Sequence, residues 1–123
     1  MKLTFDDNLA SFVVTEYTTD YIRVNKDAHN NSIIVSHSGI VPEWPPQTLE
    51  QLAAEHIEQI LKLGPEIILL GTGSKMQFPK PDILQVAYSK NIGIEVMDTA
   101  AACRTYNMLA SDGRKVVAGL ILN

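Results

Sequence analysis

Two short polar segments of the chain could carry chemistry, because each follows an apolar run typical of a buried strand. Gly71-Thr72-Gly73-Ser74-Lys75 follows the first run, and Asp98-Thr99 follows the second. Ligands of open α/β sheets bind beyond the carboxyl ends of the strands. If the two strands are neighbours in one sheet, we expect a crevice between Gly71–Lys75 and Asp98–Asn107 that binds a small molecule or an anion.

The glycines of the first segment allow two interpretations. Gly71 and Gly73 could let the backbone approach a ligand closely, with backbone amides, Ser74 and Lys75 offered to an anion. Alternatively, they form a tight exit from the strand, where glycine is needed for its dihedral angles, and we favour this second interpretation. A dinucleotide fingerprint would need a third glycine where the chain has Met76, and the spacing of a P-loop is absent.

The single cysteine, Cys103, also has two interpretations. It could be a reactive thiol helped by a nearby helix N-terminus, or a small apolar residue of the core, which is the role we favour. One cysteine excludes an internal disulfide framework and a cysteine-based zinc site. The three histidines lack metal-ligand spacing. We therefore expect neither a metal nor another cofactor, and we assign no catalytic residue.

Several other side chains have alternative roles. Trp44 stands among prolines, where it could be a hydrophobic lid, an anchor for a partner, or, as we favour, the packing point of a loop that crosses the sheet. Arg104 and Asn107 fall on the helix face opposite the core, which is either solvated or binds a partner. We expect His56 to be a core residue with one hydrogen bond, and Arg114 to be an edge charge rather than an anion contact.

The elements that position these residues follow from hydrophobic periodicity and turn signals. Residues 11–36 are rich in β-branched and aromatic side chains and predict a hairpin or meander, with a turn over 26–31. Thr48 and Gln51 form a capping-box pattern that would begin a first helix, and Gly64 and Pro65 end it. A strand over 66–70, a helix opened by 79–81 and a strand over 94–98 predict a βαβ unit. The inner face of that second helix would carry Ile83, Leu84, Ala87 and Tyr88.

The last third of the chain predicts a helix and a strand. Asp98 or Thr99 would cap a third helix that reaches about Ala110. The near-continuous apolar run over 115–122 predicts a central strand. The 123 residues therefore form one domain, 1–123, of the α/β class, with a three-layer architecture, a central mixed β-sheet, about three helices and additional N-terminal β-strands.

Composition excludes several classes of function. Hydrophobic residues make up 46% of the chain and charged residues 20%, as in ordinary globular proteins. The formal net charge of -4 gives no basic footprint for nucleic acid. No apolar run approaches the ~20 residues needed to cross a bilayer, and the opening Met1–Asp7 has no secretory h-region. We therefore expect a cytoplasmic protein that binds no nucleic acid and does not insert into a membrane.

One longer stretch resembles a known family. Residues 98–109, followed by Gly113 and Arg114, are similar to the pattern Asp-Thr-x-x-Ala-Cys-x-Thr-x-Asn-x-Leu, then Gly-Arg, of a small uncharacterised-domain family. That family includes mitochondrial complex I (NADH dehydrogenase) assembly factor 3 and the adipogenesis-associated single-domain protein. Gly71-Thr72-Gly73 after an apolar strand fits the same pattern. The resemblance is close over residues 66–122 and looser over the first third, and Arg104 falls at a variable position.

The resemblance implies a three-layer α/β fold, no established catalytic activity and a free-standing bacterial-type domain. We therefore expect a non-enzymatic binding or assembly-factor-like protein, with a protein partner at the surface around Trp44 and the Gly71–Lys75 loop. A homodimer could use a sheet edge. The alternative is a small-molecule or anion binder, or an enzyme, at the predicted crevice. The candidate pocket residues combine the family match with that crevice: Gly71, Thr72, Gly73, Ser74, Asp98, Thr99, Cys103, Thr105 and Asn107.

Overall fold

The computed structural model describes residues 11–123, so the opening residues, on which the expectation of no secretory signal depended, lie outside it. Eight strands, three α-helices and one 3-10 turn follow one another in the described part of the chain. In chain order they are β1 (Val14–Tyr17), β2 (Ile22–Val24), β3 (Asp27–His29), β4 (Ile33–Ser36), β5 (Gly39–Val41), η2 (Leu49–Gln51), α1 (Ala54–Leu61), β6 (Ile67–Thr72), α2 (Pro81–Tyr88), β7 (Gly93–Met97), α3 (Thr99–Ser111) and β8 (Val116–Ile121).

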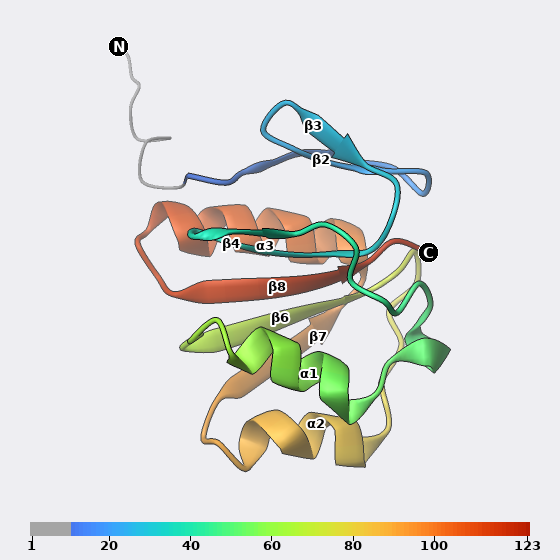
Figure 1. The fold of residues 1–123 in the computed structure, drawn as a ribbon, viewed down its shortest axis with the longest axis vertical. Coiled ribbons are helices and arrows are strands. Elements are labelled where there is room, and N and C mark those ends of the chain that lie inside the picture. Colours follow the sequence, from blue (N-terminus) through green and yellow to red (C-terminus); the bar gives the residue numbers. More distant parts are fainter. Residues whose placement is uncertain (1–10) are drawn as a thin grey trace.

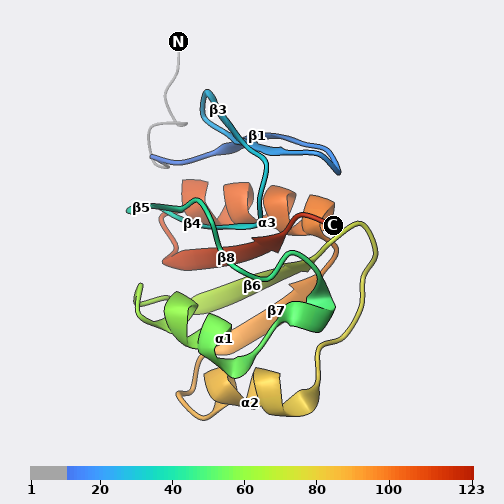
Figure 2. The same ribbon diagram turned by 45° about the vertical axis from the view of Figure 1, so that its right-hand side comes forward.

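The strands form two sheets. The larger is mixed, with the order β5-β4-β8-β6-β7, and the smaller is an N-terminal antiparallel sheet with the order β1-β2-β3. Strand β8 lies at the centre of the larger sheet, antiparallel to β4 and parallel to β6, as its apolar run predicted. Strands β6 and β7 are parallel and are joined through α2, which confirms the βαβ unit. In Figures 1 and 2 the small sheet and α2 lie at opposite ends of the molecule.

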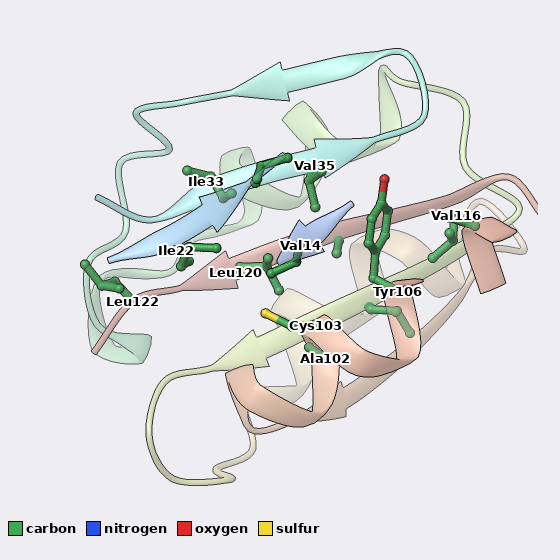
Figure 3. Packing of buried hydrophobic residues seen from close by; sticks show 14 residues of the cluster. Val14, Ile22, Ile33, Val35, Ala102, Cys103, Tyr106, Val116, Leu120 and Leu122 are labelled. Atoms are coloured by element: carbon green, nitrogen blue, oxygen red, sulfur yellow. The ribbon is translucent and has the colours of Figure 1, made fainter. Parts of the chain in front are cut away.

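The larger sheet is buried on both faces, which explains why its central strands lack alternation. One face packs against α1 and α2, and contributes Ile68, Leu70, Val117 and Ile121. The other face packs against α3 and the small sheet, and contributes Leu69, Ala118 and Leu120. Figure 3 shows this second face, with Cys103 and Tyr106 of α3 among the strand residues. The predicted three-layer α/β fold is confirmed.

Trp44 packs a loop across the sheet, as favoured. Its side chain has 0% exposure. The indole lies over Gly119 of β8, where an ideal Cβ would stand 2.6 Å from a Trp44 ring atom. Only glycine leaves room for the ring at this point of the strand. The interpretation of Trp44 as a lid or as an anchor for a partner is wrong, because the whole side chain belongs to the core.

The first helix begins at Ala54, five residues after the Leu49 start that the capping-box pattern implied. The Thr48 side chain makes no capping hydrogen bond, and the side-chain Oε1 of Gln51 accepts from the backbone amide of Gln47 instead, at 2.8 Å. Extended backbone at Leu52 separates the 3-10 turn from the helix and lets the Leu52 side chain enter the core. His56 is a core residue as predicted, because its Nδ1 accepts from the Ala53 amide at 2.9 Å.

The structure differs from two further expectations, which concern the turn over 26–31 and Tyr88. Within the hairpin or meander predicted over 11–36, the first strand begins at Val14, and β3 occupies part of the predicted turn over 26–31. The turn itself is tighter, because Asn25 adopts a positive φ of 54° and lets the chain reverse directly after β2. Tyr88 is 49% exposed, since Ile83 and Ala87, four residues apart, are the buried side chains of this short helix.

Candidate functional site

The two segments singled out by their polar residues do lie together. Strands β6 and β7 are paired so that Gly71 lies opposite Met97. Asp98 and Thr99 follow at once and begin α3. The Thr99 amide donates to the Gly73 carbonyl at 2.9 Å. The sequence therefore predicted correctly that the end of β6 and the start of α3 meet at one edge of the sheet.

At this edge the Thr99 hydroxyl joins three elements. It is fully buried, donates to the Ile121 carbonyl of β8 at 2.6 Å, and accepts from the Gly73 amide at 2.8 Å. The helix start approaches β6 so closely that an ideal Cβ on Gly71 would stand 2.8 Å from the Thr99 hydroxyl oxygen. Gly73 has a φ of 99°, and its ideal Cβ would stand 2.3 Å from the Asn123 backbone. Both glycines therefore serve close packing.

Two other candidate residues are bonded to their own chain. The Asp98 carboxylate caps α3 by accepting from the Ala101 amide at 2.8 Å. The Thr72 hydroxyl donates to the Lys75 carbonyl at 2.6 Å and accepts from the Gln77 amide at 3.2 Å. These bonds fix the base of the loop that leaves β6. Ser74, in contrast, is exposed on that loop.

The remaining candidates lie farther along α3 and belong to a different neighbourhood. Asn107 holds β1 to the helix, because its carboxamide accepts from the Val14 amide at 2.9 Å and donates to the Val14 carbonyl at 2.8 Å. Cys103, Arg104 and Asn107 line a shallow cavity of about 230 Å³ under β1, which contains neither Gly71–Lys75 nor Asp98. Thr105 is half-buried on the same helix. The nine candidate residues are therefore divided between two places.

Cys103 is a buried thiol. Burial raises its pKa from the ordinary 9.0 to about 12, an effect that the nearby Arg104 guanidinium only partly opposes. Burial also raises the pKa of Tyr17 and of Tyr106, which pack on the same side of the sheet. A thiol of this kind stays protonated at neutral pH and is a poor nucleophile. The favoured assignment of Cys103 to the core is confirmed, and the reactive-thiol hypothesis is wrong.

Arg114 is an edge charge, as favoured. Its Nε lies 3.1 Å from Glu66 Oε1, and both side chains are about half exposed. The same carboxylate accepts from the Lys115 amide at 2.8 Å. This backbone bond first, and then the Arg114 guanidinium, lower the pKa of the Glu66 carboxyl. The pair joins the starts of β6 and β8 and directs the Nε of Arg114 at a carboxylate of its own chain.

Sequence reasoning missed the most exposed apolar feature of the described chain. The loop that joins β6 to α2 runs along the outside of the molecule (Figure 2). Two of its side chains point into solvent, with Phe78 73% exposed and Met76 45% exposed. Pro79, directly after Phe78, is buried. The sequence signal was available in the segment 76–78, where two large apolar residues stand in a predicted loop.

A groove of about 410 Å³ lies beside Phe78. It is formed where the 3-10 turn, the start of α1 and the start of α2 meet the exposed loop. An apolar groove next to an exposed aromatic residue is the usual form of a site that binds a side chain of a partner. Its apolar lining comprises Leu49, Leu52, Ala53, Ala54, Phe78, Pro79 and Ile83.

Two classes of feature are absent from residues 11–123. No three His, Cys, Asp or Glu side chains of this part of the chain are grouped so as to hold a metal ion. Within the same residues, every helix is too short or too polar to pass through a bilayer.

Comparison with known proteins places the chain among relatives of undefined activity. The family model described as a protein of unknown function (DUF498/DUF598) matches residues 14–121. A "13 kDa major membrane protein" of Francisella tularensis is 29% identical over 103 residues, which are 82% of this chain and 83% of that protein. The NADH dehydrogenase [ubiquinone] 1 alpha subcomplex assembly factor 3 of Xenopus tropicalis is 32% identical over 75% of this chain, but the match spans only 54% of the assembly factor.

Solved structures agree with the fold. A Bordetella parapertussis protein is 36% identical, with a TM-score of 0.85 over 91% of this chain and 96% of its own. A Bordetella pertussis protein described as a Mth938-like domain is 30% identical, with a TM-score of 0.83 over 98% of this chain and 92% of its own. An outer membrane protein from Bartonella henselae is 27% identical, with a TM-score of 0.79 over 91% of this chain and 95% of its own.

Replacing Thr99 by valine tests the structural role of its hydroxyl. The change leaves the buried Gly73 amide and the Ile121 carbonyl without partners. Because an unsatisfied buried polar group costs about 1–3 kcal/mol, we expect Thr99→Val to lower the free energy of unfolding by roughly 2–4 kcal/mol in urea denaturation. Thr99→Ser keeps the hydroxyl and should retain most of the stability. Equal losses in the two variants would assign the effect to packing instead.

The raised pKa of Cys103 predicts a loss of stability at alkaline pH. The unfolded thiol ionises near its ordinary 9.0 and the folded thiol only near 12, so this contribution is complete below pH 9 and declines between these values. We expect the free energy of unfolding to fall by about 2 kcal/mol more in the wild type than in Cys103→Ala between pH 8 and pH 10.5. Parallel pH profiles for the two proteins would contradict the assignment.

Proposed function

The chain belongs to the DUF498/DUF598 family of proteins of unknown function, and we propose that it is a non-enzymatic binding protein of the assembly-factor type. In this proposal the chain holds a protein partner and performs no chemistry on it. Phe78 and the groove beside it form the docking surface. The single observation that carries the proposal is the 73% exposure of Phe78 on a loop that is fixed at both ends.

The loop presents Phe78 in a defined position. At its start, the Thr72 hydroxyl bonds to the Lys75 carbonyl and the Gln77 amide. At its end, Pro79 is buried and α2 begins two residues later. Less ordering entropy is lost when a surface of this kind binds a partner, because its backbone is already placed. Aromatic residues beside a groove are the side chains that most often dominate the binding energy of an interface.

The hydrogen bonds already formed at the edge of the sheet favour a protein partner over a small ligand. Thr72, Gly73, Asp98 and Thr99 all bond to their own chain. A ligand at the crevice would have to displace these bonds or compete for them. The exposed loop needs no such rearrangement. An apolar surface of this kind suits a partner that brings its own apolar side chains.

The relatives support the same class of function. The matching vertebrate proteins are described as assembly factors of NADH dehydrogenase. This chain spans about half the length of the Xenopus tropicalis protein, so the region outside the match could carry what is specific to that enzyme. We therefore transfer to this chain only the general role, which is to hold a protein partner.

We propose further that the chain acts in the cytoplasm. The single cysteine is reduced and buried, which suits a reducing compartment. Fractionation of the native cells should recover the chain with cytoplasmic markers. Recovery in a membrane pellet after a high-salt wash would contradict this assignment, and would agree with the membrane proteins among its relatives.

A photo-crosslinking amino acid at position 78 tests the docking surface directly. In native cells, p-benzoyl-phenylalanine in place of Phe78 should give a discrete adduct with another protein, which mass spectrometry identifies. The same residue in place of Tyr88, an exposed aromatic on the far turn of α2, is the matched control and should give none. Phe78→Ala should weaken the purified complex by about 2 kcal/mol, or roughly 30-fold.

Three results would overturn the proposal. Equal adducts at positions 78 and 88 would show that exposure alone determines crosslinking. An adduct with twice the mass of the chain would indicate a second copy instead of a different partner. A small anion or nucleotide that raises the melting temperature, with the effect lost in a variant of the exposed Ser74 and Lys75, Ser74→Ala/Lys75→Ala, would favour the crevice and a ligand-binding function.

A further inference from the structure

The rim of the groove beside Phe78 is acidic on two sides. Glu50 projects from the 3-10 turn and Asp82 from the first turn of α2, and both side chains line the groove and are exposed. Neither carboxylate forms an ion pair with another residue of the described chain. Lys80 also lines the groove, so two carboxylates stand against one ammonium at the rim of an apolar floor.

The two carboxylates differ in their surroundings. Asp82 stands in the first turn of α2, where the positive end of the helix dipole partly balances its charge. Glu50 belongs to a single 3-10 turn, which has little dipole of its own. Glu50 is therefore the less balanced of the two negative charges at the rim of the groove.

At the opposite end of the same helix layer, the charge is mainly positive instead of negative. Helices α1 and α2 both begin near the exposed loop and end at the far side of the molecule (Figure 1). A cavity of about 450 Å³ lies at their C-terminal ends, and its charged lining residues are Lys62, Lys90 and Glu58. A basic partner segment would be attracted to the Phe78 groove and disfavoured at this second cavity. Charge therefore distinguishes two apolar sites on one layer.

We propose that the groove binds an amphipathic segment of a partner protein that carries a Lys or Arg beside its apolar anchor. The apolar side chain fills the space bounded by Phe78, Leu52 and Ile83, and the basic side chain lies between Glu50 and Asp82. This inference rests on the proposed function, since it names the chemistry of the partner at the same surface. Apolar burial supplies most of the affinity, and the charge pair selects the partner and speeds its encounter.

Selection from a random peptide library displayed on phage tests this inference. The full chain is the target, and each selected peptide is retested on Phe78→Ala, on Tyr88→Ala as the matched aromatic control, and on the charge variants. We expect peptides with an apolar residue next to Lys or Arg, whose binding is lost in Phe78→Ala and kept in Tyr88→Ala. An exposed ion pair is worth only a few-fold in affinity, so Glu50→Lys/Asp82→Lys should weaken binding by roughly tenfold.

The controls separate charge from folding. Glu95→Lys reverses an exposed carboxylate on β7 that does not line the groove, and should leave the affinity unchanged. Raising the salt concentration should weaken binding to the wild type, and this effect should reverse in the double charge variant, because salt screens the repulsion between its lysines and a basic peptide. The salt series on the wild type tests the inference even if the double variant does not fold.

The outcomes distinguish the two proposals. Peptides that need Phe78 but lack basic residues, or whose binding is insensitive to salt, would overturn the inference and leave the proposed function standing. Failure to select any peptide that depends on Phe78 would overturn both. Acidic peptides whose binding is lost in Phe78→Ala would also contradict the inference, because they would place the opposite charge at the Phe78 groove.

Discussion

The buried hydroxyl of Thr99 is the interaction on which the edge of the sheet depends. It bonds to the Ile121 carbonyl and to the Gly73 amide, so one side chain connects β8, the start of α3 and the chain that leaves β6. The contact requires a residue without a Cβ at position 71, because any other side chain there would meet Thr99. The glycine-threonine-glycine sequence and the Asp-Thr start of the helix are therefore two halves of one junction.

That junction explains why a pattern that resembles a ligand site need not be one. Glycines after a strand and a capped helix at the neighbouring strand end are also what a close helix-to-sheet contact requires. Here Thr72 and Asp98 complete the same bonded arrangement, and Asn107 fixes β1 against α3 in a similar way. With these groups engaged, the proposed function places recognition on the loop that follows the junction, with the exposed Phe78 near its end.

The parts of the fold that were predictable are those set by local pattern. Continuous apolar runs identified β6 and β8 as buried strands. Asp98 or Thr99 was expected to cap the third helix, and Asp98 is the cap. The first helix start was missed because a capping pattern at Thr48 was overridden by the burial of Leu52. The Phe78 surface was missed for a different reason. Hydropathy favours burial of phenylalanine, and only the tertiary course of the loop leaves it exposed.

Hydrogen exchange at the Gly73 amide tests the junction most directly. This amide lies at the point where a ligand-binding loop would offer a free donor, but in the structure it is bonded to the buried Thr99 hydroxyl. The account predicts that it exchanges as slowly as the amides of β6, and that the amide of exposed Ser74 exchanges far faster. Rapid exchange at Gly73, slowed by an added anion, would contradict the account and restore the crevice as the binding site.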